Sequence, residues 1–305
     1  MRHLIDVFDL SPGEIVHIFS LAEDLKTRCQ GGLREPLLPG RVMGLLFAKP
    51  SLRTRVSFEA AMVHLGGSSL YLGDDVGWGK RESTRDFARA LSQYVDVIVC
   101  RAGDHAQVGE LAQHSQCPVI NGLTSLAHPC QALADLFTLR ELEGDLQGRT
   151  LAYVGDGNNV ARSLAAACSL LGVRFACAAP PGYELDDQFL RGIRAEVPQA
   201  EIEITADPAQ AVQDAMAVYT DVWSSMGQEA EEAQRRRAFA RYQVNAALLA
   251  HAPPDAHFMH CLPARRGQEV ADEVIDGPRS IVFHQAANRM HVQKGILAWL
   301  LTHPA

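Results

Sequence analysis

Apolar and polar residues alternate in blocks along this chain, with short apolar runs separated by longer amphipathic stretches. The short runs have the composition of buried parallel strands, whereas the longer stretches carry the apolar spacing of helices. The predicted strands are residues 42–47, 69–72, 95–100, 118–120, 150–154, 174–178, 202–205, 217–220, 257–260 and 280–283. The predicted helices include residues 53–65, 84–94, 130–143, 160–171 and 286–301.

This alternation predicts an α/β protein with two doubly wound parallel-sheet domains and helices on both faces of each sheet. A polar, glycine-containing stretch at 143–148 ends one long helix and precedes a new strand. We therefore expect one domain over 1–144 and a second over 145–285. The final helix, 286–305, could pack on either domain, and we expect it to pack back on the first.

Composition narrows the class of protein. The 305 residues are 47% apolar and 21% charged, and the net charge of −8 disfavours a general nucleic-acid binder. Neither a signal peptide nor an apolar run of roughly 20 residues is visible, so we expect no membrane partner. The seven cysteines are odd in number and form no C-x-x-C pair, which predicts reduced thiols in a cytoplasmic protein and no zinc site.

Residues 49–55 (KPSLRTR) follow a predicted strand and open a predicted helix. A helix start offers unpaired N–H groups and a partial positive charge, which together bind phosphate. Ser51 and Thr54 add hydroxyl groups, and Arg53 can make a two-pronged contact with phosphate oxygens. An ordinary Ser cap with surface arginines explains the same residues equally well.

His128 and Gln131 lie at the start of another predicted helix. The helix dipole disfavours a charged imidazole there, so a neutral His128 N–H can donate to a carbonyl oxygen. Gln131 lies one turn further on and can bind an amide. Taken alone, a capping His with a solvated Gln is the simpler interpretation.

Two segments of the second half also follow predicted strands. Residues 155–159 (GDGNN) resemble a dinucleotide turn, but the third glycine is missing and Asp156 would repel a pyrophosphate. The asparagines suit a small polar ligand better, with a plain turn as the alternative. Asp221 ends another strand, where its carboxylate can hold an ammonium group. The charge run 235–237 after it is interpreted as a solvated face.

Cys261 follows His260 at the end of the predicted strand 257–260 and suggests a nucleophilic thiol. Adjacent strand residues point to opposite faces, so His260 is poorly placed to activate Cys261. We therefore expect a thiol that contacts a ligand beside Asp221, with a simple buried cysteine as the alternative. The last helix places Arg289 near a strand end.

Together these segments resemble the transcarbamylase family, in the same order and spacing from Ser51 to Arg289. SxRTR at 51–55 and HPxQ at 128–131 resemble the carbamoyl phosphate signature of the whole family. DxxxSMG at 221–227 and HCLP at 260–263 are similar to signatures of its ornithine-using branch. The resemblance implies transfer of the carbamoyl group from carbamoyl phosphate to the side-chain amine of L-ornithine, giving L-citrulline and phosphate in arginine metabolism without a metal or organic cofactor.

The resemblance also implies residue roles, with carbamoyl phosphate bound by domain 1–144 and ornithine by domain 145–285. Carbamoyl phosphate would contact Ser51, Leu52 (through its backbone), Arg53, Thr54, Arg101, His128, Gln131, Cys261, Leu262 and Arg289. Ornithine would contact Asn159, Asp221, Ser225 and Met226. The catalytic residues would be Arg101, His128, Cys261 and Arg289. The family is trimeric with active sites at subunit borders, which implies a homotrimer or a multiple of trimers.

The chain departs from the family pattern at two places. Position 52 is Leu where Thr is frequent, and residues 75–83 lack the Gln that reaches a neighbouring subunit's phosphate in many relatives. Lys80 or Arg81 are candidate replacements. Three other functions stay open: transfer to aspartate or an acylated ornithine, a non-catalytic phosphate sensor, and a nicotinamide-dependent dehydrogenase. The motifs do not indicate the direction of the reaction in the cell, assembly beyond a trimer, or regulation.

Overall fold

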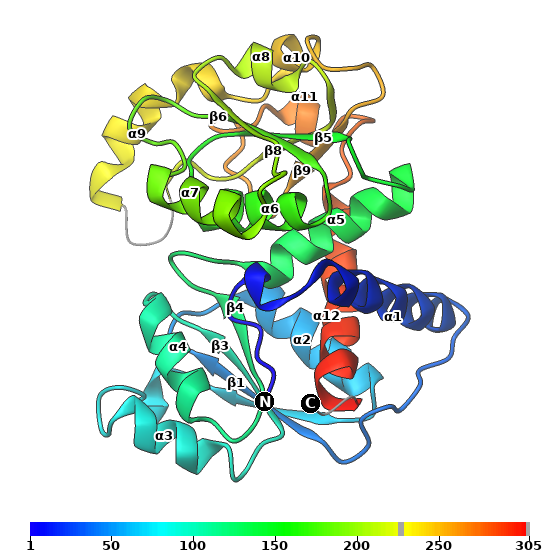
Figure 1. Ribbon diagram of the computed structural model, residues 1–305, viewed down its shortest axis with the longest axis vertical. Helices are drawn as coiled ribbons and strands as arrows, with labels where there is room; N and C mark the ends of the chain where they lie inside the picture. Colours follow the sequence, from blue (N-terminus) through cyan, green and yellow to red (C-terminus); the bar gives the residue numbers. More distant parts are fainter. Residues whose placement is uncertain (225–228, 303–305) are drawn as a thin grey trace. The chain divides into compact units, whose positions relative to one another are not determined.

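The computed structural model describes residues 1–224 and 229–302. The chain forms two compact units, the first of residues Met1–Phe137 with Ala287–Ala305 and the second of Thr138–Ala286. The chain passes from one unit to the other inside two helices, α5 (Pro129–Glu143) and α12 (Val282–Thr302) (Figure 1). The structural division therefore lies inside α5, whereas the polar stretch at 143–148 marks the end of that helix.

The first unit contains a four-stranded parallel sheet with the strand order β2-β1-β3-β4. Its strands are β1 (Val42–Phe47), β2 (Ser68–Leu72), β3 (Val97–Arg101) and β4 (Val119–Leu123). Its helices, besides its parts of α5 and α12, are η1 (Val7–Asp9), α1 (Pro12–Gln30), α2 (Leu52–His64), η2 (Asp74–Val76), α3 (Thr84–Leu91) and α4 (His105–His114).

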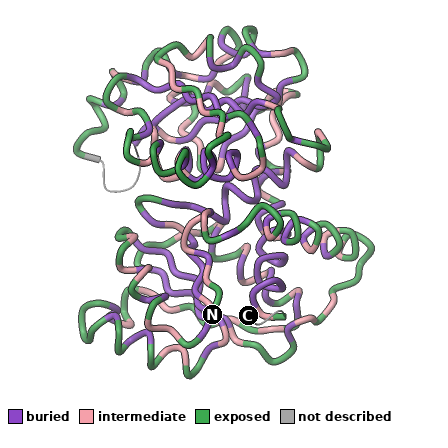
Figure 2. Tube along the Cα trace, in the orientation of Figure 1, coloured by how far each residue is buried: buried purple, intermediate pink, exposed green. Residues whose placement is uncertain are grey.

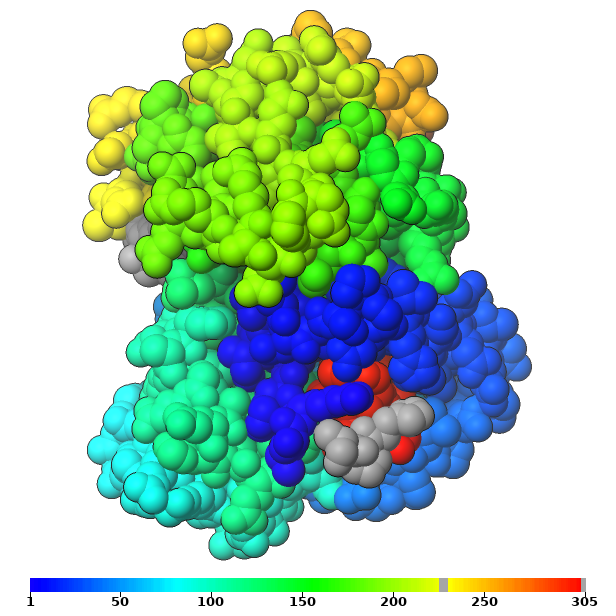
Figure 3. Space-filling view, in the orientation of Figure 1, coloured from blue at the N-terminus to red at the C-terminus, as the bar shows by residue number. Residues whose placement is uncertain are grey.

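Helices α3 and α4 cover one face of this sheet, where Phe87 and Val108 pack with Leu46 and Ile98. Helices α1 and α12 pack closely together at Gly295. A Cβ atom at this position would lie only 2.6 Å from the Ile18 carbonyl oxygen, so a residue without a side chain is needed there. The N-terminal segment also lies beside α12, with Arg2 over the Trp299 ring at 5.3 Å (Figure 3). The last helix is thus part of the first unit's core from Ala287 onward.

The second unit contains a five-stranded parallel sheet with the strand order β7-β6-β5-β8-β9. Its strands are β5 (Thr150–Val154), β6 (Arg174–Ala178), β7 (Ile202–Thr205), β8 (Ala215–Thr220) and β9 (His257–His260). Its helices are α6 (Asn159–Leu170), α7 (Asp187–Glu196), α8 (Pro208–Val212), η3 (Glu229–Glu231), α9 (Glu232–Ala238), η4 (Ala240–Tyr242), α10 (Ala246–Leu249) and α11 (Asp272–Ile275).

The inner strands β5 and β8 of this second sheet are buried on both faces, whereas the edge strand β7 is partly exposed (Figure 2). On one face, Ala152 and Val218 join an apolar cluster with Leu248 of α10. On the other face, the rings of Tyr153 and Tyr219 stack with centroids 5.7 Å apart. Strands buried on both faces need continuous apolar sequence, which is why the apolar runs predict them well.

The predicted fold class is confirmed by these two parallel sheets with their helices. Nine of the predicted strands correspond to observed strands, some with shifted ends, but the strand predicted at 280–283 is wrong. There only Ser280 forms an isolated bridge, with Phe258, and α12 begins at Val282. Val282 is 1% exposed and Phe283 72%, because this apolar run forms the first turn of a helix with one buried side.

Within the described part of the chain, no helix combines the length and the apolar character that crossing a bilayer requires.

Candidate active site

In the first unit, the loop after β1 brings Ser51 to the start of α2. Ser51 is extended, with φ −157° and ψ 112°, and its hydroxyl accepts a hydrogen bond from the Thr54 N–H at 3.4 Å. This is an N-cap, and it leaves the first N–H groups of the helix, on Leu52 and Arg53, for another acceptor. The Leu52 side chain is 74% exposed, so only its backbone is suited to such a contact. The capping and the phosphate interpretations of this segment are therefore compatible.

Two arginines donate hydrogen bonds to the hydroxyl oxygen of Thr54. Arg101, at the end of β3, donates from Nη1 to the Thr54 hydroxyl at 3.4 Å, and Arg289 of α12 donates from Nη2 to the same oxygen at 3.1 Å. All three side chains are buried. Two guanidinium groups around one neutral oxygen form a concentrated positive charge that suits an anion with several oxygens.

Gln131 is held on both sides of its amide. Its Nε2 donates to Asp135 Oδ1 at 2.8 Å, and its Oε1 accepts from Arg289 Nη1. Gln131 is buried, so the interpretation of a solvated Gln is wrong. Asp135 accepts an amide N–H of Gln131, which turns the Gln131 carbonyl oxygen toward Arg289. A carbonyl oxygen has two lone pairs, so it can also accept from an N–H donor on a ligand.

His128 precedes α5 and is buried in the same unit. Burial lowers the pKa of His128 well below its ordinary value, and the charges of Arg289 and Arg101 lower it further. The imidazole is therefore neutral at neutral pH and can donate one hydrogen bond without adding charge. Sequence reasoning reached the same protonation state from the helix dipole, whereas burial and the two arginines are the leading causes here.

Other cations of the first unit are differently placed. Arg53 is half-buried at the start of α2, whereas Arg55 is exposed, pairs with Glu59 at 3.0 Å and lies over the Tyr71 ring at 3.8 Å. Lys80 is exposed and contacts both carboxylate oxygens of Asp74 at 2.7 Å. Arg55 is thus occupied by local partners, and the role of Lys80 stays a prediction.

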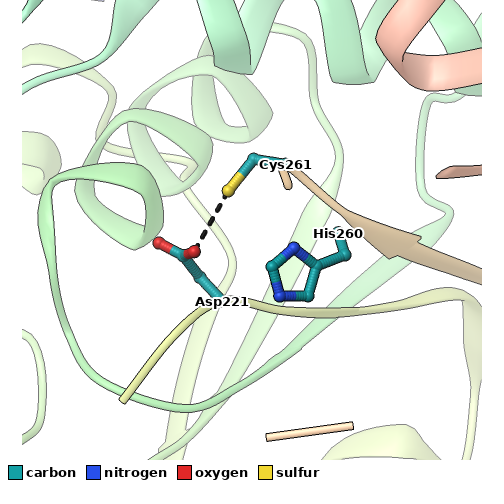
Figure 4. A group of neighbouring side chains, drawn as sticks. All are labelled: Asp221, His260 and Cys261. Atoms are coloured by element: carbon teal, nitrogen blue, oxygen red, sulfur yellow. Dashed lines mark hydrogen bonds between the residues drawn. The ribbon is translucent and has the colours of Figure 1, made fainter. Parts of the chain in front are cut away.

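In the second unit, two segments converge on the carboxylate of Asp221, which follows β8. The Cys261 thiol, after β9, donates to Asp221 Oδ1 at 3.1 Å, and the two side chains point toward one another (Figure 4). Asn158 donates from Nδ2 to Asp221 Oδ2 at 2.8 Å. The thiol therefore lies beside Asp221. The segments that follow neighbouring parallel strands form this cluster, at the carboxyl ends of the strands, where ligands of such folds bind.

His260 is the buried neighbour of Cys261, and its ring is engaged by other groups. Its Nδ1 accepts the Leu262 N–H at 2.8 Å, and its Nε2 lies 3.2 Å from Glu269 Oε1. Within the described residues, one group of possible metal ligands has its ligand atoms within 4.8 Å of one another: Asp221, His260 and Cys261. Because both ring nitrogens of His260 are used, this group is not arranged as a metal site.

Asp156 and Arg235 form a buried ion pair, with Nη1 and Oδ2 2.9 Å apart. Burial raises the pKa of Asp156 to about 6, while Arg235 opposes this shift. Arg235 also donates to the Trp223 carbonyl oxygen at 3.1 Å. The interpretation of 235–237 as a solvated face is therefore wrong for Arg235, because its partner lies in a distant turn that a local charge pattern cannot reveal.

The ornithine residues implied by the resemblance are only partly placed. Asn159 is the first residue of α6 and is half-buried, whereas its neighbour Asn158 holds Asp221 and caps the helix by accepting from the Val160 N–H at 2.9 Å. The predicted helix 160–171 would make Asn159 the capping residue, whereas the helix begins one residue earlier and the cap is Asn158. Ser225 and Met226 lie outside the described residues.

Comparison with known proteins gives two family matches that follow one another along the chain. The carbamoyl-P binding domain of aspartate/ornithine carbamoyltransferase matches residues 2–141, and the Asp/Orn binding domain matches residues 147–300. An ornithine carbamoyltransferase of Pyrococcus abyssi is 48% identical over 303 residues, covering 98% of this chain and 96% of the relative. One from Chromobacterium violaceum is 50% identical, covering 99% and 97%.

Among solved structures, an ornithine carbamoyltransferase from Pyrococcus furiosus matches with a TM-score of 0.95 and 47% identity, covering 100% of this chain and 98% of that one. Two parallel α/β units with these clusters, matched over nearly their whole length, define a carbamoyltransferase. The chain belongs to the aspartate/ornithine carbamoyltransferase family, which confirms the resemblance seen in its motifs.

Proposed function

We propose that this protein transfers the carbamoyl group of carbamoyl phosphate to the side-chain amine of L-ornithine, giving L-citrulline and phosphate. The observation that carries the donor side is the buried convergence of Arg101 and Arg289 on Thr54 beside the start of α2. Carbamoyl phosphate offers the phosphate oxygens for that cluster and the N–H groups for the carbonyl oxygen of Gln131. The names of the similar proteins support the same donor and acceptor.

The choice of ornithine as the acceptor substrate is supported by the charge of the second unit's candidate residues. Ornithine carries a net positive charge at neutral pH, whereas aspartate carries a net negative one. Asp221 is a buried acidic group at the end of β8, whereas the nearby Asp156 is paired with Arg235. A buried carboxylate such as Asp221 attracts an ammonium group and repels additional carboxylates, so it favours ornithine over aspartate.

The mechanism that we propose uses positioning and electrostatics. Carbamoyl phosphate binds through the helix start, Arg53 and the buried arginines, and ornithine binds through Asp221, Asn159 and residues 225–226. The ornithine side-chain amine loses its proton, and burial near arginines favours that neutral form. The free amine attacks the carbamoyl carbon, while Arg101, Arg289 and the neutral His128 stabilise the oxyanion that develops. The bond between the carbamoyl carbon and the phosphate oxygen then breaks, the attacking nitrogen gives its remaining extra proton to the departing phosphate, and the arginines neutralise the phosphate charge.

An amine-specificity assay tests this function directly. Ornithine, aspartate, N-acetylornithine and putrescine are offered in parallel with carbamoyl phosphate, and the carbamoylated products are quantified. We expect citrulline to form with the highest kcat/KM. A preference for another amine would refute ornithine as the acceptor, and the absence of any carbamoylated product would favour a phosphate sensor. Titration of a nicotinamide cofactor, followed by its fluorescence, tests the dehydrogenase alternative.

A second test concerns the helix start. We expect Arg53→Ala to lose most activity while the far-ultraviolet circular dichroism spectrum is unchanged. Saturation of the variant by carbamoyl phosphate at wild-type concentrations would contradict the phosphate role of this segment. Arg55→Ala is the matched control, because Arg55 is occupied by Glu59 and Tyr71.

We also propose that the protein is a homotrimer or a multiple of trimers in the cytoplasm. The outer face of α2 exposes Leu52, Val56 and Val63, and the edge strand β2 exposes Leu70 and Tyr71. Exposed apolar side chains on a helix and an adjacent open strand edge are typical of a subunit interface. All seven cysteines lie in the described residues and none forms a disulfide, which fits a reducing compartment. Sedimentation equilibrium of the purified protein would test the trimer.

A further inference from the structure

Glu269 is a buried carboxyl group that none of the roles above uses. Glu269 and His260 both have 0% exposed surface. The His260 Nε2 lies 3.2 Å from Glu269 Oε1, and the same oxygen accepts the Arg265 N–H at 2.5 Å. Glu269 is itself fixed by its backbone, because its carbonyl oxygen accepts the Val244 N–H at 2.8 Å and the next residue pairs with Val244.

The hydrogen bonds of His260 assign its tautomer. A backbone N–H can only donate, so the Leu262 N–H that points at Nδ1 requires an unprotonated nitrogen there. The ring proton of the neutral imidazole is then on Nε2, where Glu269 accepts it. The carboxyl group of Glu269 thus selects the one tautomer whose Nδ1 can hold Leu262.

Leu262 needs this support. Its φ is +57°, the left-handed region that residues with a Cβ rarely adopt. Leu262 directly follows Cys261, whose thiol contacts Asp221, so the conformation of Leu262 controls where the chain goes after that thiol. Glu269 holds this turn at two points, through the ring of His260 and through the Arg265 N–H.

We propose that Glu269 is a positioning residue for the acceptor half of the site, acting through the His260 ring to fix the Leu262 backbone and the Cys261–Asp221 contact. This inference rests on the proposed function only for the identity of the acceptor amine. Glu269 touches neither substrate in this role, so its loss raises the KM for ornithine. The KM for carbamoyl phosphate changes less, because Thr54, Arg101 and Arg289 are held independently of Glu269 and only Cys261 and Leu262 among the implied contacts are affected.

The chain provides a matched control on the same strand. His257, at the start of β9, contacts Glu143 with Nε2 and Oε1 2.9 Å apart, whereas His260 ends that strand. Glu143→Leu removes the same kind of His–Glu contact from the other end of β9. We expect it to leave both KM values within about twofold of wild type, since partly exposed pairs contribute little.

The experiment compares Glu269→Leu, Glu269→Gln and Glu143→Leu by steady-state kinetics and by hydrogen exchange of peptides covering 258–268. Glu269→Leu keeps similar volume but no acceptor, and we expect the ornithine KM to rise about tenfold and the Leu262 amide to exchange faster. Glu269→Gln keeps an acceptor oxygen and should restore both properties most of the way. Equal changes in the two KM values, or unchanged exchange at Leu262, would overturn the proposal.

If Glu269→Leu does not fold, His260→Phe tests the same link through the ring. Phe keeps a planar ring but offers no acceptor to Leu262, so we expect faster exchange of the Leu262 amide and a raised ornithine KM. Wild-type exchange and kinetics in that variant would reject the proposal. If another amine proved to be the acceptor, the proposed function would fail, whereas the exchange measurement would still decide the role of Glu269.

Discussion

The two clusters of candidate residues use the same kind of scaffold for opposite charges. In the first unit, Arg101 and Arg289 converge on the neutral hydroxyl of Thr54. In the second unit, Asn158 and Cys261 converge on the carboxylate of Asp221. Both clusters lie after parallel strands, where helix starts and strand ends leave polar groups available. The sheet therefore fixes where a ligand binds, and the side chains decide which charge it carries.

The largest expected effect is on the cationic cluster. Arg101→Met removes one of two buried guanidinium groups that neutralise the phosphate and the developing oxyanion. We expect kcat/KM for carbamoyl phosphate to fall by about 10²–10³, the usual loss for one preorganised donor. Initial rates of citrulline formation measure it. Arg191→Met, at an exposed position of α7, is the control, and an equal loss there would show that the effect is not local.

How far such residues can be predicted from sequence depends on how local their determinants are. The strands at 42–47 and 150–154 follow from their continuous apolar runs, and Ser51 follows from the cap that it forms. The run at 280–283 looks like a strand, yet its apolar residues bury one side of a helix. Only the chain's later course, into the core of the first unit, decides between these structures.

The candidate site shows the same limit. The motifs predict Arg101, Asp221 and Cys261 as site residues, but they do not show which atoms are in contact. The charge run 235–237 predicts a solvated Arg235, because its partner, Asp156, lies 79 residues away and no local pattern links them. Glu269 and Asp135 act on His260 and Gln131 rather than on a ligand, so no substrate chemistry points to them in the sequence.

The next largest effect concerns the free energy of unfolding and involves Asp156 of the second unit. Burial raises the pKa of Asp156 to about 6 from an unfolded value near 4, so the folded state holds the proton more tightly. The unfolded state therefore loses its proton first as pH rises, and this stabilising contribution, complete below about pH 4, is lost by about pH 6. A shift of this size corresponds to about 3 kcal/mol.

Urea unfolding of wild type and Asp156→Asn between about pH 4 and pH 7 measures this contribution. We expect the wild-type free energy of unfolding to fall relative to the variant's as pH rises. His128 has the opposite slope, because its lowered pKa removes stability as pH falls below its ordinary value near 6.5. A His128→Asn variant should be less sensitive to acid. Parallel curves for Asp156→Asn and wild type would contradict the shifted pKa.

A smaller effect, confined to one substrate, is expected at Asp221. In the wild type, Asn158 Nδ2 donates to a carboxylate oxygen of Asp221. In Asp221→Asn, the new amide can place its NH2 group against that donor, and the negative charge that would attract ornithine is lost. Losing a hydrogen bond to a charged group costs about 1.5–3 kcal/mol, so we expect kcat/KM for ornithine to fall roughly 10–100-fold. The dissociation constant for carbamoyl phosphate, measured by calorimetry, should not change. Asp187→Asn, exposed on α7, is the control.

The smallest expected effect tests whether phosphate binding in the first unit depends on the backbone or on the side chain at position 52. Leu52→Thr introduces the residue that is frequent in the family. Because the Leu52 side chain is 74% exposed, we expect a free energy of unfolding within about 0.5 kcal/mol of wild type and an unchanged KM for carbamoyl phosphate. Leu52→Pro is the informative partner. Proline is tolerated as the first residue of a helix, and Ser51 already has the extended backbone that a following proline requires.

Leu52→Pro therefore removes one N–H group from the start of α2 while the helix stays intact. We expect carbamoyl phosphate to bind about tenfold more weakly to this variant, because a phosphate oxygen loses a charge-assisted hydrogen bond. Circular dichroism and calorimetry distinguish this from unfolding. If Leu52→Thr weakened binding as much as Leu52→Pro, the side chain would be the determinant, and the contrast between a backbone-built anion site and a side-chain-built acidic cluster would fail at this position.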